Sequence, residues 1–418
     1  MLYRLFELLQ NYDIPGQHLM SYLSFRALLA AVISMLIAWF AGKRIIGWLQ
    51  RKQIGETIRD LGLEGQMQKK GTPTMGGIII ILSLIVSVLL VCDLRNIYVL
   101  LLLLTTIWCG TMGFIDDSIK TFRHNKDGMS EKAKLAGQVG LGLIIALTVC
   151  FNNDIVVRES VRLQTVTTVR DSLDVDSERA VEDSRWSEQD VVKSTKTTIP
   201  FVKDHEFDYK WLSPFKGRWG WYFKWAVYML MIVLVITACS NGANLTDGMD
   251  GLATGTSAIV AAVIGVLAWL GGNIVNSGYL HIMYIPGSGE IAVFMSAFAG
   301  ALIGFLWYNT YPAQVFMGDT GSLAIGGIIG VSAVLIRKEL LLPLLCGIFF
   351  VESASVIIQR KWFHHTKKKY GEGRRVFLMA PLHHHYQKKG IPEPRIVTRF
   401  WIVGIILGLA TLAIFKIR

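Results

Sequence analysis

The sequence predicts an all-α polytopic membrane protein with about ten transmembrane helices and both termini on the extracytoplasmic side. Of the 418 residues, 52% are hydrophobic and only 17% are charged, whereas a soluble domain carries about 25% charged residues. The apolar residues form long uncharged runs that reach the length needed to cross a bilayer. The basic residues gather in alternate connections between these runs, as membrane orientation signals do. The whole chain, 1–418, is therefore expected to form one integral membrane domain.

Ten apolar runs are expected to span the membrane, because polar or turn-forming connections separate them. The first run ends at the basic stretch AGKRIIGWLQRK, and short polar connections divide the next three. The fifth run follows a long polar segment, and stretches rich in Gly and Asp separate it from the sixth and the seventh from the eighth. The ninth run leads into a second basic stretch, and the tenth closes the chain. In order, the runs are 26–40, 76–92, 97–115, 135–151, 222–239, 252–270, 291–308, 322–336, 340–358 and 400–417.

Lysine and arginine set the expected orientation. They are abundant in the connections after the first, third and ninth runs, whereas the short connections of opposite parity hold only Arg95, Arg337 and Lys338. The positive-inside rule therefore places the basic connections in the cytoplasm. The formal net charge of +11 is explained by basic connections that contact the anionic headgroups of membrane lipids. No nucleic-acid partner is expected. The five cysteines lie in or beside apolar runs without metal-ligand spacing, so they are interpreted as core residues.

Residues 152–220 form a long polar connection of mixed charge that lies outside by parity. Long translocated segments ignore the charge rule, so this insertion does not contradict the orientation. Its stretch RLQTVTTVRDSLDV alternates apolar and polar residues, which favours a strand. We expect an extracytoplasmic insertion without a catalytic site, and we expect removal of most of residues 157–209 to leave activity intact.

The unusual polar residues converge on the predicted cytoplasmic face. GFIDDSIK brings Asp116 and Asp117 to the end of the third run, with Lys120 three residues further on. Adjacent carboxylates at a membrane helix end repel each other and need water, a cation or a substrate to compensate them. SNGANLTDGMDGLATG follows the fifth run, FMGDTGSL follows the seventh, and APLHHHYQKKG precedes the tenth. Because the orientation rests on lysine and arginine alone, this gathering of acids and histidines independently indicates one site.

Each motif also has a purely structural interpretation. The adjacent aspartates suit a solvated helix end, and TDGMDG suits a tight turn. Asp319 suits the N-cap of the helix that follows it. The three histidines suit a solvated basic loop, since they lack the i, i+4 spacing of a helical zinc pair. HHTKKKYGEGRR suits a loop that contacts lipid headgroups.

The combination of these residue types favours one kind of chemistry. Several carboxylates without cysteine ligands suit a hard cation that keeps water ligands, namely Mg²⁺. Mg²⁺ binds through one or two carboxylates together with substrate phosphates, and lysines nearby neutralise phosphate charge. The set therefore predicts phosphoryl transfer at the cytoplasmic surface, between a soluble diphosphate and a lipid phosphate.

These motifs, in this order, resemble those of the polyprenyl-phosphate N-acetylhexosamine-1-phosphate transferases. The similarity covers most of the chain and is carried by KKGTPTMGG, DDSIK, NLTDGMDGL, MGDTGSL and APLHHHYQKKGIPEP. Within the family, the chain looks like the members that transfer phospho-MurNAc-pentapeptide from UDP-MurNAc-pentapeptide to undecaprenyl phosphate, giving lipid I and UMP. That reaction is the first membrane step of peptidoglycan synthesis. The resemblance implies Mg²⁺ as cofactor, the inner membrane of a bacterial cell, a cytoplasmic active site, and ten spans with both termini outside; a homodimer is left open.

The resemblance also assigns roles to residues. The catalytic residues would be Asp116, Asp117, Asp319 and His383, with Asp319 as the metal ligand. The substrate-binding residues would be Lys70, Thr74, Lys120, Asn244, Asp247, Asp250, Phe316 and His384. Among these, Lys70 and Lys120 would contact phosphates, and Phe316 would lie near the uracil. We expect Asp117 to be the more directly catalytic member of the adjacent pair.

Alternatives remain for both the mechanism and the function. Direct attack by the lipid phosphate is favoured, because an anionic oxygen needs positioning more than covalent relay, but a phosphoryl-enzyme stays open. A transferase for UDP-GlcNAc is the alternative within the family, and KKGTPTMGG and APLHHHYQKKG argue against it. A cation-coupled transporter is the alternative from another class, and it predicts acids near the bilayer midplane rather than at helix ends.

Overall fold

The computed structural model describes residues 2–9, 17–52, 71–123, 128–158, 192–199, 206–280 and 282–414. Lys70 lies outside these residues, and so does the stretch 162–175 in which a strand was predicted. All ten runs that were expected to span the membrane coincide with helices, some of them longer than the run and one of them broken.

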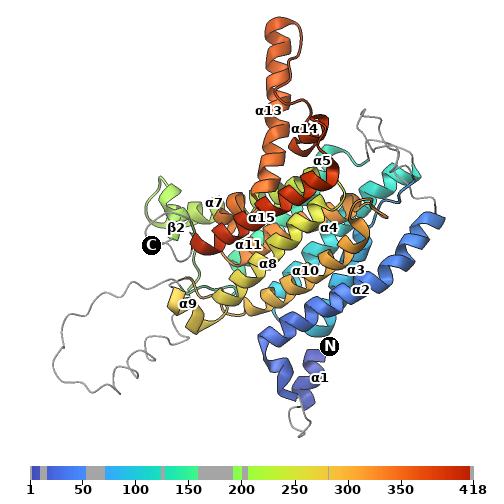
Figure 1. Cartoon of the computed structure of the whole chain (residues 1–418). Coiled ribbons are helices and arrows are strands. Elements are labelled where there is room, and N and C mark those ends of the chain that lie inside the picture. Colours follow the sequence, from blue (N-terminus) through green and yellow to red (C-terminus); the bar gives the residue numbers. More distant parts are fainter. Residues whose placement is uncertain are drawn as a thin grey trace, which may run out of the picture.

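Helices dominate the described residues (Figure 1). In chain order they are α1 (Leu2–Leu9), η1 (Gln17–Ser21), α2 (Leu23–Arg51), α3 (Gly77–Val91), α4 (Ile97–Phe122), α5 (Glu131–Phe151), η5 (Tyr209–Leu212), α7 (Gly217–Thr246), α8 (Leu252–Gly271), α9 (Ile274–Leu280), α10 (Gly289–Asn309), α11 (Gly318–Leu335), η6 (Glu339–Leu341), α12 (Leu342–Leu345), α13 (Gly347–Tyr370), α14 (Leu382–Lys388) and α15 (Glu393–Ile414).

The lengths of the helices agree with a polytopic membrane protein. Among the described residues, eight helices are long and apolar enough to cross a membrane, and the bent pair Glu339–Leu345 and Gly347–Tyr370 would make a ninth. The second expected span coincides with α3, a shorter apolar helix of 15 residues. The helical membrane class is therefore confirmed, while the number of ten spans and the location of the termini stay predictions.

The centre of the bundle is formed by α10 and α11. Within their most apolar windows, 89% of α11 and 72% of α10 is buried, compared with 22% of α2 and 28% of α15. Small residues permit this packing: a Cβ at Gly326 of α11 would overlap the backbone of Cys239 in α7, and one at Gly300 of α10 would overlap the backbone of Ala31 in α2. Residues on α11 are consequently held by several neighbouring helices at once.

The ninth expected span is broken near its start. The segments Glu339–Leu345 and Gly347–Tyr370 meet at an angle of 78°, and Pro343 lies in the short helix before the break. Beyond the break, α13 continues unbroken to Tyr370 and projects from the bundle with α14 packed against it (Figure 1). The interpretation of residues 364–375 as a loop was therefore wrong for most of their length.

Part of the insertion folds into a small structure that we call the outer cap, composed of β1 (Lys196–Thr198), β2 (Glu206–Asp208) and η5. The two strands pair antiparallel, so the described residues contain one two-stranded sheet beside the helices. The outer cap covers the far end of α11: the Thr198 N–H donates to the Arg337 carbonyl at 3.0 Å. The Tyr209 hydroxyl donates to Glu339 at 3.3 Å, and both side chains are buried.

The outer cap also buries a lysine. Lys338 is 4% exposed and donates to the hydroxyl of Thr198, and burial lowers the pKa of Lys338 to about 8. Removing residues 157–209 would strip this cover from the end of α11. The expectation that most of residues 157–209 can be removed with activity intact stays a prediction, and the outer cap indicates that such a cut should spare β1, β2 and Tyr209.

Candidate active site

A glycine contact brings the adjacent aspartates against the start of α11. A Cβ at Gly113 of α4 would overlap the backbone of Asp319 and Thr320, so only glycine permits this approach. Asp116 and Asp117 lie three and four residues after Gly113, on the same face of α4. The close helix contact therefore delivers both carboxylates to the first turn of α11.

The carboxylate of Asp117 caps the N-terminus of α11 from a different helix. Its Oδ1 accepts the N–H of Asp319 at 3.1 Å, and its Oδ2 accepts the N–H and the hydroxyl of Thr320 at 2.9 and 2.6 Å. A helix N-terminus offers unpaired N–H groups and favours negative charge. The interpretation of Asp319 as the N-cap was wrong: the N-cap position is Met317, which makes no side-chain cap.

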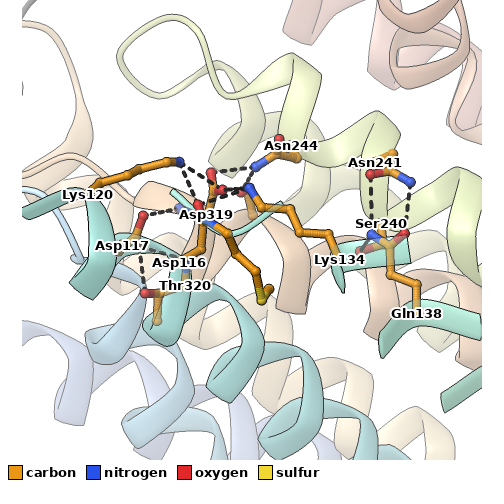
Figure 2. A network of polar contacts seen from close by, with 12 residues as sticks. Asp116, Asp117, Lys120, Lys134, Gln138, Ser240, Asn241, Asn244, Asp319 and Thr320 are labelled. Atoms are coloured by element: carbon orange, nitrogen blue, oxygen red, sulfur yellow. Dashed lines mark hydrogen bonds and ion pairs between the residues drawn. The ribbon is translucent and has the colours of Figure 1, made fainter. Parts of the chain in front are cut away.

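Two lysines bridge Asp116 and Asp319 (Figure 2). The Nζ of Lys120 lies 2.6 Å from Asp116 and 3.0 Å from Asp319. The Nζ of Lys134, from α5, lies 2.9 and 2.7 Å from the same two carboxylates. The side chain of Asp116 is fully buried, and that of Asp319 is 14% exposed. Cations therefore compensate carboxylates that would otherwise be costly at this depth.

The same carboxylates match the preferences of a divalent cation. One oxygen from each of Asp116, Asp117 and Asp319 lies within 4.8 Å of the others. The donor set is entirely carboxylate oxygen, which suits a hard cation such as Mg²⁺ and does not suit zinc or copper. With three carboxylates and two ammonium groups, the cluster keeps one formal negative charge in excess. The residues present therefore fit a divalent metal ion.

Asn244 joins the cluster from α7. Its Nδ2 donates to Asp319 and to the hydroxyl of Ser322, both at 2.8 Å. One turn earlier on α7, Asn241 exchanges two amide hydrogen bonds with Gln138 of α5, at 3.0 and 3.2 Å (Figure 2). This exchange ties together the two helices that carry Asn244 and Lys134 to the cluster.

The segment before α3 runs beside the segment before α11. The N–H of Phe316 donates to the Pro73 carbonyl, and the N–H of Gly76 donates to the Phe316 carbonyl, both at 2.8 Å. Thr74 is 7% exposed. A Cβ at Gly318, whose φ is +72°, would lie against the Thr74 hydroxyl and the Asp117 carboxylate. Thr74 and Phe316 thus lie at the edge of the aspartate cluster.

Asp247 and Asp250 lie in the turn between α7 and α8. The carboxylate of Asp250 is buried and accepts the N–H of Ala313 at 3.0 Å, while its own N–H donates to Glu393 at 2.8 Å. Asp247 is half-buried at the end of α7. Asp250 therefore holds the turn against the segment that leads to α11, and a contact of either residue with substrate stays a prediction.

The histidine triplet begins a helix. His383 is fully buried in α14, and its imidazole packs against the Cα of Gly248, where any side chain would overlap it. His384 pairs with Gln387 at 3.1 Å, and its ring lies 4.2 Å from that of His383. The interpretation of this triplet as a solvated loop was wrong for His383.

Three residues of the site escaped the sequence analysis. The sequence pattern indicated Lys134 only as one of the basic residues that set the membrane orientation, although its ammonium group pairs with both Asp116 and Asp319. Thr320 lies inside MGDTGSL and binds Asp117. Glu352 is a buried acid beside His383, and an acid inside an apolar run is a signal that could have identified it.

The chain is similar to known membrane transferases. The family model described as glycosyl transferase family 4 matches residues 191–337, and the signature described as phospho-N-acetylmuramoyl-pentapeptide-transferase signature 1 matches residues 69–81. Curated relatives named phospho-N-acetylmuramoyl-pentapeptide-transferase are 53% identical in Flavobacterium psychrophilum, 51% in Parabacteroides distasonis and 50% in Porphyromonas gingivalis. In each case the similarity covers 100% of this chain and 100% of the relative.

Proposed function

This chain belongs to the phospho-N-acetylmuramoyl-pentapeptide-transferase family, and from that premise we propose that it converts UDP-MurNAc-pentapeptide and undecaprenyl phosphate into lipid I and UMP. The observation that carries the proposal is the cluster of three carboxylates and two lysines at the meeting point of α4, α5 and α11. Such a cluster binds phosphates and a divalent cation, as the reaction requires.

The reaction is a displacement at phosphorus. An oxygen of undecaprenyl phosphate attacks the β-phosphorus of the nucleotide, the bond from that phosphorus to the bridging oxygen breaks, and UMP leaves with that oxygen. Lys120 and Lys134 neutralise phosphate charge, since each ammonium group already bridges two carboxylates and can exchange one for a phosphate oxygen. Asn244 and Thr74 then orient the substrate beside them.

Mg²⁺ would be held by Asp319, with Asp116 and Asp117 close enough to contribute. When bound, it would neutralise the charge that develops on the phosphate oxygens during transfer. The lysines would then turn from the carboxylates towards the substrate phosphates, which keeps the charge of the site balanced.

The contacts support different tasks for the adjacent aspartates. Asp117 uses both oxygens on the N-terminus of α11 and so holds Asp319 in place. Asp116 faces both lysines through Oδ2, where it can also orient the attacking phosphate. This division differs from our expectation that Asp117 is the more directly catalytic of the two, and kinetics of the two Asn variants separate them.

The protein would lie in the inner membrane of a bacterial cell with the cluster at the cytoplasmic face. The arrangement of lysine and arginine supports this orientation. The cluster and the outer cap lie at opposite ends of α11, so a cytoplasmic cluster would place the outer cap outside.

Purified protein with Mg²⁺ and undecaprenyl phosphate tests the proposal, by measuring UMP release from UDP-MurNAc-pentapeptide and from UDP-GlcNAc. We expect turnover of the first substrate only, and near-complete loss of turnover in Asp319→Asn. Asp154→Asn, an exposed acid in the insertion, is the matched control and should keep parental activity. Turnover of UDP-GlcNAc instead would favour the alternative transferase, and release of UMP from neither substrate by folded protein would refute the proposal.

A further inference from the structure

A buried carboxylate lies outside the aspartate cluster, on a helix that sequence analysis treated as purely apolar. Glu352 is fully buried, lies six residues before the end of the expected ninth span (340–358), and belongs to the first two turns of α13. A buried ionisable group in a membrane helix is costly, so it is retained where it has a partner and a task. Among the described residues, the partner that the structure provides is His383.

The carboxylate holds His383 at two points. Its oxygens accept the backbone N–H of His383 at 3.2 and 3.4 Å, and Oε2 lies 3.2 Å from the imidazole Nδ1. The Nδ1 atom makes no hydrogen bond with the described residues, so its contact with Oε2 is one of close approach only. One side chain therefore sets both the position of the backbone and the rotation of the ring.

Within the part of the chain that the structure describes, the opposite edge of the imidazole has no hydrogen-bond partner. Nε2 is buried and forms no hydrogen bond with the described residues, and it faces Gly248 in the turn that follows Asn244 and Asp247. A buried ring nitrogen without a partner is unfavourable unless a ligand supplies one. Because the carboxylate of Glu352 lies against the Nδ1 edge, Nε2 is the ring nitrogen that is left to meet a ligand.

We infer that Glu352 is a positioning residue, which holds His383 so that its Nε2–H donates to a phosphate oxygen of the substrate. The inference rests on the proposed function. The carboxylate of Glu352 lies 3.2 Å from Nδ1 and so fixes the rotation of the ring, and a hydrogen bond from a ring N–H to an ionised phosphate is stronger than one between neutral groups. Glu352 itself does not touch the substrate.

A cycle of variants separates positioning from a general structural role. Glu352→Gln keeps the length of the side chain and an acceptor oxygen for the backbone N–H, but removes the charge. We expect kcat to fall about 10- to 100-fold with little change in KM for the nucleotide, since loss of a supporting contact typically costs this much. Glu352→Asp keeps the charge and should restore part of the loss.

The decisive comparison is made in the absence of the imidazole. In a His383→Gln background, Glu352→Gln should cost no further activity, because Glu352 acts through His383. Ser353→Ala is the matched control on the same helix, since among the described residues this hydroxyl bonds to the Phe349 carbonyl alone, and it should keep parental kcat. If Glu352→Gln does not survive extraction, Glu352→Asp takes its place in the cycle.

UMP release from UDP-MurNAc-pentapeptide in detergent, together with thermal midpoints, measures each variant. Parental kcat in Glu352→Gln, or losses that multiply in the double variant, would overturn the inference while the parent still turns over. A folded parent that releases no UMP would instead mark the failure of the proposed function, so the two failures are distinguishable.

Discussion

Gly113→Ala tests whether close contact of α4 with α11 positions the aspartate cluster. The substitution removes no chemical group, yet its methyl group would overlap the carbonyl of Asp319 and the Cα of Thr320. Backbone atoms cannot rotate away as a side chain can, so α11 must retreat from α4. The three capping bonds from Asp117 to the first turn of α11 then lengthen.

The magnitude follows from the geometry. A displacement of roughly 1 Å in an active site costs about 100-fold in rate, so kcat should fall by about that factor. Overpacking costs about 1–3 kcal/mol, and replacing a helical glycine by alanine returns about 1 kcal/mol. The variant should therefore remain folded, with a thermal midpoint only a few degrees below that of the parent.

Gly140→Ala is the matched control. A Cβ at Gly140 of α5 meets Trp108 at 3.7 Å, an ordinary contact, so the control should keep its activity and gain thermal stability. UMP release and thermal unfolding in detergent measure both variants. Parental kcat in Gly113→Ala would refute the claim that this contact sets the geometry of the cluster.

Three further predictions concern the lysines and the outer cap. Lys134→Met should lower the Mg²⁺ concentration for half-maximal rate, because one competing cation is lost from Asp116 and Asp319. The same variant should raise KM for the nucleotide. A higher Mg²⁺ requirement in a titration would contradict this reasoning. Replacing residues 159–191 by a short Gly/Ser bridge should keep activity, since Val157 and Val192 already pair. Extending the deletion through Tyr209 should lower the thermal midpoint. Equal midpoints for the two deletions would show that the outer cap adds no stability. Lys338→Met should stabilise the protein at neutral pH, and this advantage should shrink as the pH rises from 8 towards 10.5. In that range the unfolded parent binds a proton that native Lys338 has lost, so the stability of the parent rises with pH. Thermal midpoints that keep a constant difference across this range would contradict the prediction.

The positions of the helices were predictable because they depend on local composition. A run of apolar residues must satisfy its own backbone hydrogen bonds in the membrane, so it forms a helix whatever its neighbours are. The ends of the helices were less predictable. The run 97–115 continues as α4 to Phe122 and carries Asp116 and Asp117 inside the helix, because Lys120 and Lys134 compensate charges that the hydropathy pattern counted against a helix.

Which acids share a face was also predictable, since orientation follows from the distribution of lysine and arginine. The structure joins Asp116, Asp117 and Asp319 in one cluster, as the shared face led us to expect. The capping of α11 by Asp117 was not predictable, because the two elements are separated by about 200 residues in the chain and meet only through the packing of Gly113.

The sequence by itself determined that the chain crosses a membrane as helices, that its acids gather at one face, and that those acids suit phosphate and a hard cation. These properties reside in residue types and in their order. Only the tertiary structure decided which carboxylate binds which partner: Asp117 the helix N-terminus, Asp116 the lysines, and Glu352 the buried His383. A buried charge is stable only beside a partner in contact with it, and contacts between distant segments depend on how closely the helices can pack.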